Sequence, residues 1–220
     1  MNTATEISDM IGEEHIGTSI DTPLRDDAFE MDDEVKIKLI EKHFREIMFL
    51  LGLDLEDDSL KGTPHRVAKM YVKEVFSGLN PVNKPSIKLF DNKYKYNEML
   101  IEKDITLYSY CEHHFVPIIG KVHVAYISHG KVIGLSKINR LVQHYAKRPQ
   151  VQERLTNQIA EGLKEALQSE DVAVIVDAVH LCVSSRGVQD TSSSTITVNY
   201  SGAFQEAKRK EEFLGLLRKL

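Results

Sequence analysis

Residues 100–135 read LIEKDITLYSYCEHHFVPIIGKVHVAYISHGKVIGL, and this stretch decides the fold. Two runs in it, Leu100–Tyr110 and Lys121–Ser128, are rich in β-branched and aromatic residues, as is typical of strands. His129–Gly130 predicts a hairpin turn into a further short strand, Lys131–Leu135. We therefore expect neighbouring antiparallel strands, with a Cys-Glu-His-His tetrad between the first two.

The segments around this stretch predict an α+β fold. Three more runs have strand composition, namely Ser86–Phe90, Val172–Val183 and Ser194–Tyr200. Helical periodicity marks Ser136–Lys147 and Val151–Gln168. We predict a four-stranded antiparallel sheet with helices on one face. Such a sheet keeps two exposed edges unless it closes against other subunits, so we also expect an oligomer.

Helix signals dominate the chain before the sheet. Asp32 can cap a helix that Gly52 ends, and Thr63 can cap a second helix that Gly78 ends. Residues 203–220 predict a terminal helix. We accordingly divide the chain into an acidic N-terminal arm (1–30), an N-terminal helical region (31–85) and a sheet domain (86–220).

Composition excludes several classes of protein. Of the 220 residues, 42% are hydrophobic and 28% are charged, a balance typical of soluble globular proteins. No apolar run approaches the roughly 20 residues of a membrane span, so we expect no membrane association. The start of the chain is acidic and polar, and two cysteines cannot make a multi-bridge scaffold. We therefore expect a cytoplasmic protein.

Charge is unevenly distributed along the chain. Residues 1–34 contain eleven Asp and Glu against Arg25 alone, so the net charge of −5 divides into −10 there and +5 on residues 35–220. We interpret the acidic segment as a solvated arm. The mildly basic remainder suits an anionic small ligand as well as it suits nucleic acid. No Lys or Arg block is long enough to predict nucleic-acid binding by itself.

The tetrad supplies candidate metal ligands. Cys111 and His114 are three residues apart, and Cys182 is the only other cysteine. Thiolate and imidazole are the ligands that zinc prefers, and three protein ligands leave a position for water, as in catalytic zinc sites. A Cys111–Cys182 disulfide or two buried thiols remain open as alternatives. On the predicted strand His180 shares a face with Cys182, so His113 and His180 could act as acid–base groups beside the metal.

Further charged residues suggest a substrate site. Ser136 is predicted to cap a helix whose first turn carries Lys137, with Arg140 three residues on, an arrangement suited to phosphate. Glu153 opens the next helix, where it could accept a pair of hydrogen bonds from guanine. Arg186 follows the predicted His180/Cys182 strand. Each has an ordinary alternative: a capped surface helix, a favourable acid in a first helical turn, and a solvated loop arginine.

Five motifs taken together resemble the GTP cyclohydrolase I family. The resemblance covers about residues 32–215, and its specificity comes from the order and spacing of the motifs. They are TPHRVAKMY (63–71, with SGL at 77–79), CEHHF (111–115), GLSKINR (134–140), RPQVQERLT (148–156) and HLC-x3-RG (180–187).

This resemblance implies an enzyme and an assembly. It implies a tunnelling fold (T-fold) for residues 86–220 and a variable arm over residues 1–30. The T-folds would form a toroidal homodecamer, a dimer of pentamers with active sites at subunit interfaces. The implied reaction converts GTP and water into 7,8-dihydroneopterin triphosphate and formate, the entry step of folate and pterin biosynthesis. A non-catalytic zinc-stabilised scaffold and a Cys–His nucleophilic hydrolase are the alternatives.

The resemblance also assigns roles to residues. His180 matches a proton donor to the purine ring, with His113 in the same pocket. Glu153, with Gln152, matches the position that holds the guanine edge, and Ser136 lies near the ribose. The matching zinc ligands are Cys111, His114 and Cys182. The triphosphate would be held by Lys137, Arg140 and Arg186, with Arg66 and Lys69 from a neighbouring subunit.

Overall fold

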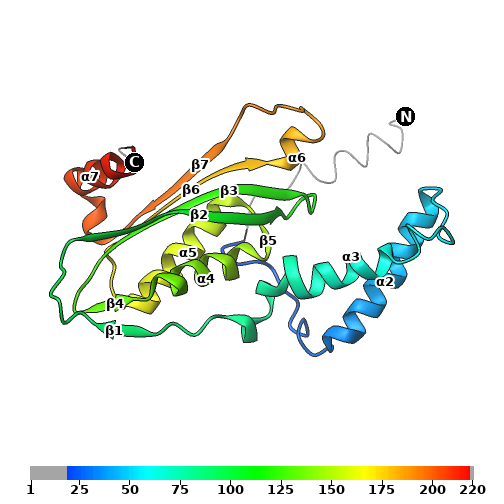
Figure 1. Cartoon of the computed structure of the whole chain (residues 1–220), viewed down its shortest axis with the longest axis horizontal. Helices are drawn as coiled ribbons and strands as arrows, with labels where there is room; N and C mark the ends of the chain where they lie inside the picture. Colours follow the sequence, from blue (N-terminus) through cyan, green and yellow to red (C-terminus); the bar gives the residue numbers. More distant parts are fainter. Residues whose placement is uncertain (1–18, 219–220) are drawn as a thin grey trace.

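The computed structural model describes residues 19–218, and a curled five-stranded sheet is its centre (Figure 1). Four long strands are antiparallel in the order β2-β3-β6-β7, which confirms the predicted antiparallel sheet. A two-residue strand, too short to show periodicity, adds in parallel to the end of β2 and was not predicted. The strands are β2 (Met99–Cys111), β3 (Pro117–Ile127), β5 (Pro149–Gln150), β6 (Val172–His180) and β7 (Thr195–Tyr200).

The hairpin expected through His129–Gly130 is wrong. The strand after this turn, β4 (Lys131–Ile133), leaves the main sheet and pairs with β1 (Leu89–Asp91) in a separate two-stranded sheet. The turn is held from the β1 side, because the Asn92 backbone N–H donates to the Gly130 carbonyl at 3.0 Å and the Asn92 side chain donates to the Ser128 hydroxyl. These bonds direct the chain away from β3.

Helices cover both faces of the sheet, not the one face predicted. On the main face α4 (Leu135–Ala146) and α5 (Gln152–Leu167) pack against alternate strand residues to form the larger core. On the opposite face α7 (Ala207–Arg218) buries Phe213 against Phe204, Ala173 and Ile175 at one end of the strands. The α7 sequence alone could not say which face it would cover. At the other end this face is open.

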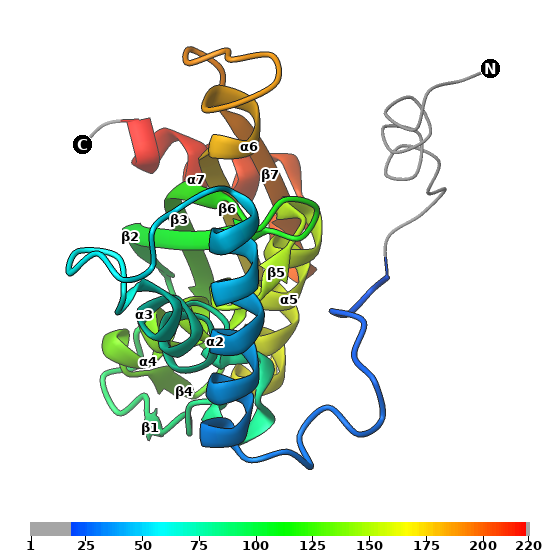
Figure 2. The same ribbon diagram turned by 90° about the vertical axis from the view of Figure 1, so that its right-hand side faces the viewer.

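The helical region before the sheet is close to its prediction. Asp32 caps α2 (Asp33–Leu50) by accepting from the Glu34 N–H at 2.8 Å, whereas Thr63 is the first residue of α3 (Thr63–Met70) and Gly62 occupies the cap position. Short turns η1 (Tyr71–Val75), η2 (Ser77–Leu79) and η3 (Pro81–Asn83) lead into the sheet domain. Figure 2 shows the two helices beside α4, and the segment before α2 passing on the α5 side. Residues 1–18 of the predicted arm lie outside the described residues.

One close backbone contact anchors this helical region. The Gly78 N–H donates to the Lys147 carbonyl at 2.9 Å, and the Gly78 carbonyl accepts from Arg148 Nε at 2.8 Å. A Cβ at Gly78 would lie 2.0 Å from the His144 carbonyl oxygen, so only glycine fits.

Within residues 19–218 no helix has the length and apolar character required to cross a bilayer.

A buried histidine supports the same anchor. His144 is 6% exposed, and its Nε2 accepts from Arg148 Nη2 at 2.8 Å. Its Nδ1 has no hydrogen-bond partner among the described residues. Burial, followed by the charges of Arg148 and Lys84, lowers the pKa of His144 to about 4. The ring is therefore neutral near pH 7, and protonation would remove the acceptor that Arg148 uses.

We expect acid to weaken the fold through His144. Its folded pKa is below its unfolded value, so its contribution is present above about pH 6.5 and is lost as pH falls towards 4. Urea unfolding should show that wild type loses on the order of 1–3 kcal/mol more than His144→Gln over this range. The exposed His43→Gln variant is the control and should follow wild type. Equal pH slopes for wild type and His144→Gln would contradict the assignment.

Candidate metal centre

Three potential metal ligands meet where strands end. Cys111 is the last residue of β2 and is 5% exposed, His114 lies in the turn that leads into β3, and Cys182 lies just beyond β6. Their ligand atoms all lie within 4.8 Å of one another. The Cys111 Sγ and His114 Nδ1 atoms are 3.8 Å apart. The tertiary structure thus brings together the three residues that the sequence singled out.

The path of the chain to Cys182 differs from the prediction. β6 ends at His180, and Cys182 lies in a single helical turn, α6 (Leu181–Ser184), so the two side chains do not share a strand face. In β6, Val174, Val176 and Ala178 face the helix-covered core, and His180 continues that side. The prediction that His180 and Cys182 share a strand face is therefore wrong. The turn folds Cys182 back to Cys111.

The donor set fits a tetrahedral metal ion. Zinc–sulfur and zinc–nitrogen bonds of about 2.3 and 2.0 Å at tetrahedral angles place the two ligand atoms about 3.5 Å apart, close to the 3.8 Å found between Cys111 and His114. The two cysteines are not joined to each other. Burial, together with the Cys111 thiol, raises the pKa of Cys182, and a bound cation would oppose that by favouring the thiolate.

A hydrogen-bond network fixes His180. Its Nε2 lies 2.7 Å from Oε1 of Gln152, and the Gln152 amide donates to the Val176 and Thr195 carbonyls at 3.1 and 2.8 Å. Gln152 is 1% exposed, and its NH2 group also reaches the Thr197 hydroxyl. Since the NH2 group is committed to these acceptors, the Gln152 oxygen accepts from a proton on His180 Nε2. Gln152 thus faces inward towards His180.

The neighbouring acid faces the other way. Glu153, in the first turn of α5, is exposed. Its charge acts on His180, whose pKa burial lowers and Glu153 raises in part, so the two side chains belong to one site. Arg186 is also exposed, and its Nη1 lies 2.7 Å from Nε2 of His114. The metal ligands, His180, Glu153 and Arg186 therefore share one end of the sheet.

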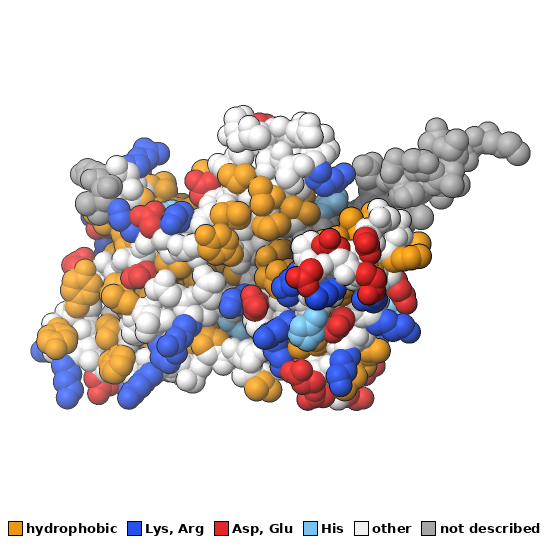
Figure 3. All heavy atoms as spheres, turned by 45° about the vertical axis from the view of Figure 1, so that its right-hand side comes forward, with side chains coloured by type: hydrophobic (Ala, Val, Ile, Leu, Met, Phe, Trp, Pro, Cys, Tyr) orange, Lys and Arg blue, Asp and Glu red, His pale blue; other side chains and the backbone are white. Residues whose placement is uncertain are grey.

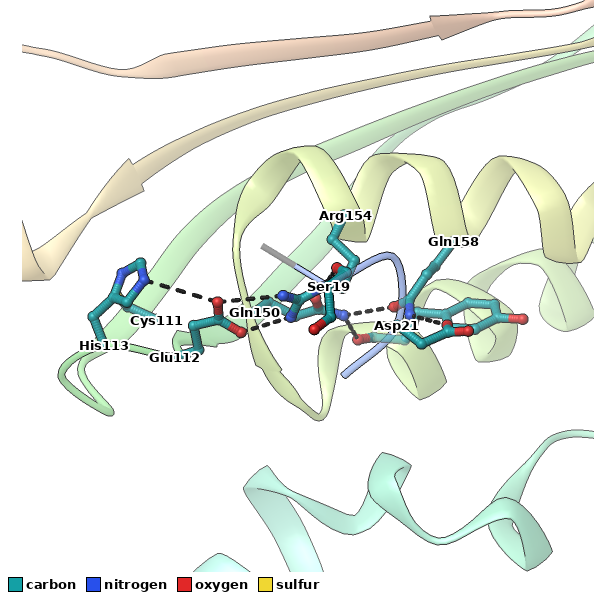
Figure 4. A network of polar contacts seen from close by, with 9 residues as sticks. Ser19, Asp21, Cys111, Glu112, His113, Gln150, Arg154 and Gln158 are labelled. Atoms are coloured by element: carbon teal, nitrogen blue, oxygen red, sulfur yellow. Dashed lines mark hydrogen bonds and ion pairs between the residues drawn. The ribbon is translucent and has the colours of Figure 1, made fainter. Parts of the chain in front are cut away.

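Sequence reasoning missed an ion pair beside the ligands. Arg154 donates to Glu112 through Nη1 at 2.6 Å and Nη2 at 3.2 Å, and the Arg154 side chain is 3% exposed (Figure 4). His113 Nε2 lies 3.8 Å from Glu112, and His113 Nδ1 lies 3.8 Å from the Cys111 sulfur. A usable signal was the position of Arg154 beside Leu155 on the buried side of an amphipathic helix, where a charge requires a partner.

The other predicted substrate residues do not lie at the end of the sheet that carries Cys111, His114 and Cys182. Ser136, Lys137 and Arg140 lie in the first turns of α4, whose Asn139 donates to Glu102 at 3.2 Å. Glu102 is nine residues before Cys111 in β2, a separation of roughly 30 Å along a strand. Gly134, not Ser136, occupies the cap position of α4.

The two cations of the N-terminal helical region lie on α3. Arg66 and Lys69 lie on the exposed side of α3, and Arg66 donates to the Ser59 carbonyl and the Thr63 hydroxyl at 3.1 and 2.7 Å. This helical region packs through aromatic rings on the segment from Cys111 to Phe115, called here the metal loop. The Phe76 and Phe115 rings are 5.0 Å apart. The CEHHF motif contains Phe115, but nothing in the sequence predicts that its ring packs on Phe76.

Fold and site together define a class of protein. Three ligands with a position left for water, next to a held histidine, form a metal centre of the catalytic kind on a mixed α/β scaffold. The family model for GTP cyclohydrolase I matches residues 40–218. This chain belongs to the GTP cyclohydrolase I family.

Curated relatives agree over nearly the whole chain. GTP cyclohydrolase 1 of Flavobacterium johnsoniae is 58% identical over 210 residues, which cover 96% of this chain and 94% of the relative. The protein of the same name from Citrobacter koseri is 51% identical, with 99% of each chain covered. That of Escherichia coli K12 is 53% identical, with 95% of each covered.

The ligand assignment makes a direct prediction. His114→Ala and Cys182→Ser should each lose bound divalent metal, because two remaining ligands bind a single ion weakly. Metal per chain, measured by elemental analysis after dialysis against zinc, should fall far below that of wild type. His129→Ala, an exposed histidine at the other end of the sheet, should keep the wild-type content. Full metal content in Cys182→Ser would refute the site.

Proposed function

We propose that the Cys111/His114/Cys182 centre binds zinc and that this chain is a GTP cyclohydrolase I. The reaction converts GTP and water into 7,8-dihydroneopterin triphosphate and formate. The observation that carries the proposal is the three-ligand centre, with His180, held by Gln152, two residues before the ligand Cys182. Family membership and the nearly full-length identity to proteins named GTP cyclohydrolase 1 support the activity.

The residues at the metal end of the sheet have different roles in this proposal. Zinc, when bound, supplies Lewis acidity that activates water near neutral pH. Glu153 accepts the guanine edge as a pair of hydrogen bonds, and its exposed position leaves it free to do so. Gln152 holds the Nε2 proton of His180, so the proton that His180 gives to the purine ring would come from Nδ1 of its protonated form, with His113 lining the pocket. The Gln152 NH2 group already donates to backbone carbonyls of the sheet. We therefore assign Gln152 to orienting His180 and not to binding guanine.

Metal binding would also release Arg186. Its guanidinium can only donate, and His114 Nε2 accepts from it in the structure. With metal on either ring nitrogen of His114, Nε2 is either a ligand or carries a proton, and it can no longer accept from Arg186. The arginine then has an unpaired guanidinium at the mouth of the site, suited to a phosphate of GTP.

The remaining substrate residues come from a second subunit in this proposal. Ser136, near the ribose, and the phosphate-binding Lys137 and Arg140 are too far from Cys111 to serve the same substrate within one chain. Arg66 and Lys69 join the triphosphate clamp from a neighbour in the same way. Sites of this kind require contact between the two ends of adjacent sheets.

The open sheet face supports such an assembly. Large hydrophobic residues are exposed on it, and Figure 3 shows hydrophobic side chains gathered over the strands, beside a region of mixed charge over α2 and α3. The strand β7 also has an unpaired edge within residues 19–218. We propose a T-fold domain over 86–220 that assembles as a toroidal homodecamer, a dimer of pentamers, with residues 31–85 as the helical region. The exposed face residues are Tyr108, Ile119, Ile196 and Val198.

The activity is tested by measuring both products. Wild type with GTP should yield formate and, after oxidation, fluorescent pterin in equal amounts, and chelation should abolish both. Glu153→Ala should keep its metal but lose turnover, since removing a desolvated charged contact costs on the order of 2–5 kcal/mol. Glu161→Ala, an exposed acid of the same helix, is the matched control. Turnover retained by Glu153→Ala would sink its assignment, and formate without pterin would remove the role of Ser136.

Subunit sharing predicts complementation between inactive variants. Cys182→Ser lacks the metal end, and the double variant Lys137→Ala/Arg140→Ala lacks the phosphate end. Unfolded together and refolded as a mixture, they should regain part of the wild-type activity, because some interfaces then combine two intact ends. Each variant refolded alone is the control. A mixture no more active than its components would show that each site lies within one chain.

A further inference from the structure

The pair Glu112–Arg154 is the most deeply buried ion pair among the described residues and has no role in the chemistry above. Glu112 lies directly between the ligand Cys111 and His113. It accepts two hydrogen bonds from one guanidinium, at 2.6 and 3.2 Å, with its own side chain 18% exposed. A two-point contact fixes both the position and the direction of a carboxylate.

The guanidinium is itself held on its other side. Arg154 Nε donates to the carbonyl of Ser19 at 2.9 Å, so three separate donors of the side chain are engaged. Four residues on in α5, Gln158 donates to Asp21 at 2.8 Å and accepts from Gln150 at 2.8 Å. Figure 4 shows these groups in one line that runs from the segment before α2 across α5 to the metal loop.

The backbone of the metal loop is tied to the same place. The Glu112 N–H donates to the Gln150 carbonyl at 3.0 Å, and Cys111 pairs with Gln150 between β2 and β5. Glu112 is thus held through its backbone by β5 and through its side chain by Arg154. Both restraints act on the residue that follows the first ligand, at the start of the turn that must place His114.

We propose that Arg154 is a positioning residue that holds the Cys111–His114 loop in its metal-binding geometry through Glu112. Arg154 touches neither ligand nor substrate in this assignment. Its effect is to limit the conformations of the loop before metal arrives, so that less order has to be gained on binding. Groups that orient metal ligands from outside typically change metal affinity or activity 10–100-fold when removed. The proposal uses the metal centre of the proposed function but not its reaction.

The test compares Arg154→Gln with wild type in metal binding, without GTP. Zinc competition with a chelator should show about tenfold weaker binding, and the cobalt-substituted protein should show altered visible absorption bands, which report ligand geometry. Arg154→Lys, which keeps the charge but cannot make the two-point contact, should recover only part of the affinity. Arg45→Gln removes an arginine from an exposed ion pair with Glu56 and should behave as wild type.

A second variant and a kinetic measurement separate positioning from folding. If Arg154→Gln does not fold, Glu112→Gln removes the charge at the partly exposed end of the pair and should give the same loss. With GTP, kcat should fall while KM stays near the wild-type value. Wild-type zinc affinity and cobalt spectrum in the folded variants would overturn the proposal. A wild type that binds metal but does not convert GTP would overturn the proposed function alone.

Discussion

The antiparallel register of β2, β3 and β6 is the constraint on which the rest of the structure depends. Tyr110 pairs with Pro117, and the next residue of β3, Ile118, pairs with His180. Neighbouring strands are about 4.8 Å apart, so the ends of β2 and β6 lie within roughly 10 Å of each other. Because side chains alternate between faces, a register shift of one residue would turn His180 away from Gln152. The metal centre exists because two distant strands end at the same level.

Burial of polar side chains is the second consequence of this arrangement. α5 must cover the sheet with apolar residues, yet its first turns carry Gln152 and Arg154, which are 1% and 4% exposed. Each is satisfied by groups that the sheet brings close: strand carbonyls and His180 for Gln152, Glu112 for Arg154. A buried polar group without a partner would be costly, so these contacts hold both histidine and loop in defined positions. The hydrogen bonds of Gln152 and Arg154 therefore both order the site and allow α5 to pack on the sheet.

The separation of α4 from the metal end is the reason that the proposed function needs more than one chain. α4 runs alongside β2, with its start beside Glu102 and its last turn beside Ser109, whose hydroxyl donates to the Ala146 carbonyl at 2.8 Å. Its free N–H groups and cations therefore face the end of the sheet opposite to Cys111. In the proposed function another copy of the chain, placed end to end, supplies them to the same substrate. The open apolar face and the unpaired strand edge give such a copy a surface to bind.

Local signals in the sequence were sufficient for the long strands, the helices and the residue types of the metal centre. Strand composition and helical periodicity depend on neighbours in the chain, and so does the preference of thiolate and imidazole for metal. Local signals were insufficient where the fold depends on distant partners. β4 pairs with β1 because Asn92 holds the turn, and α7 packs on the face of the sheet that α4 and α5 leave uncovered. A two-residue strand such as β5 has no periodicity to detect.

The side chains available for chemistry can be identified from the sequence alone. The proposed metal-dependent reaction on an anionic substrate uses six side chains whose identities are read directly from the sequence: Cys111, His114, Cys182, His180, Glu153 and Arg186. Which of these side chains meet depends on how distant segments pack. The tertiary structure closed Cys182 onto Cys111 through the turn of α6, directed Gln152 inward and Glu153 outward, and joined Glu112 to Arg154. Distance and burial are properties of the packed chain, since they depend on residues far apart in the sequence that approach only when the core forms.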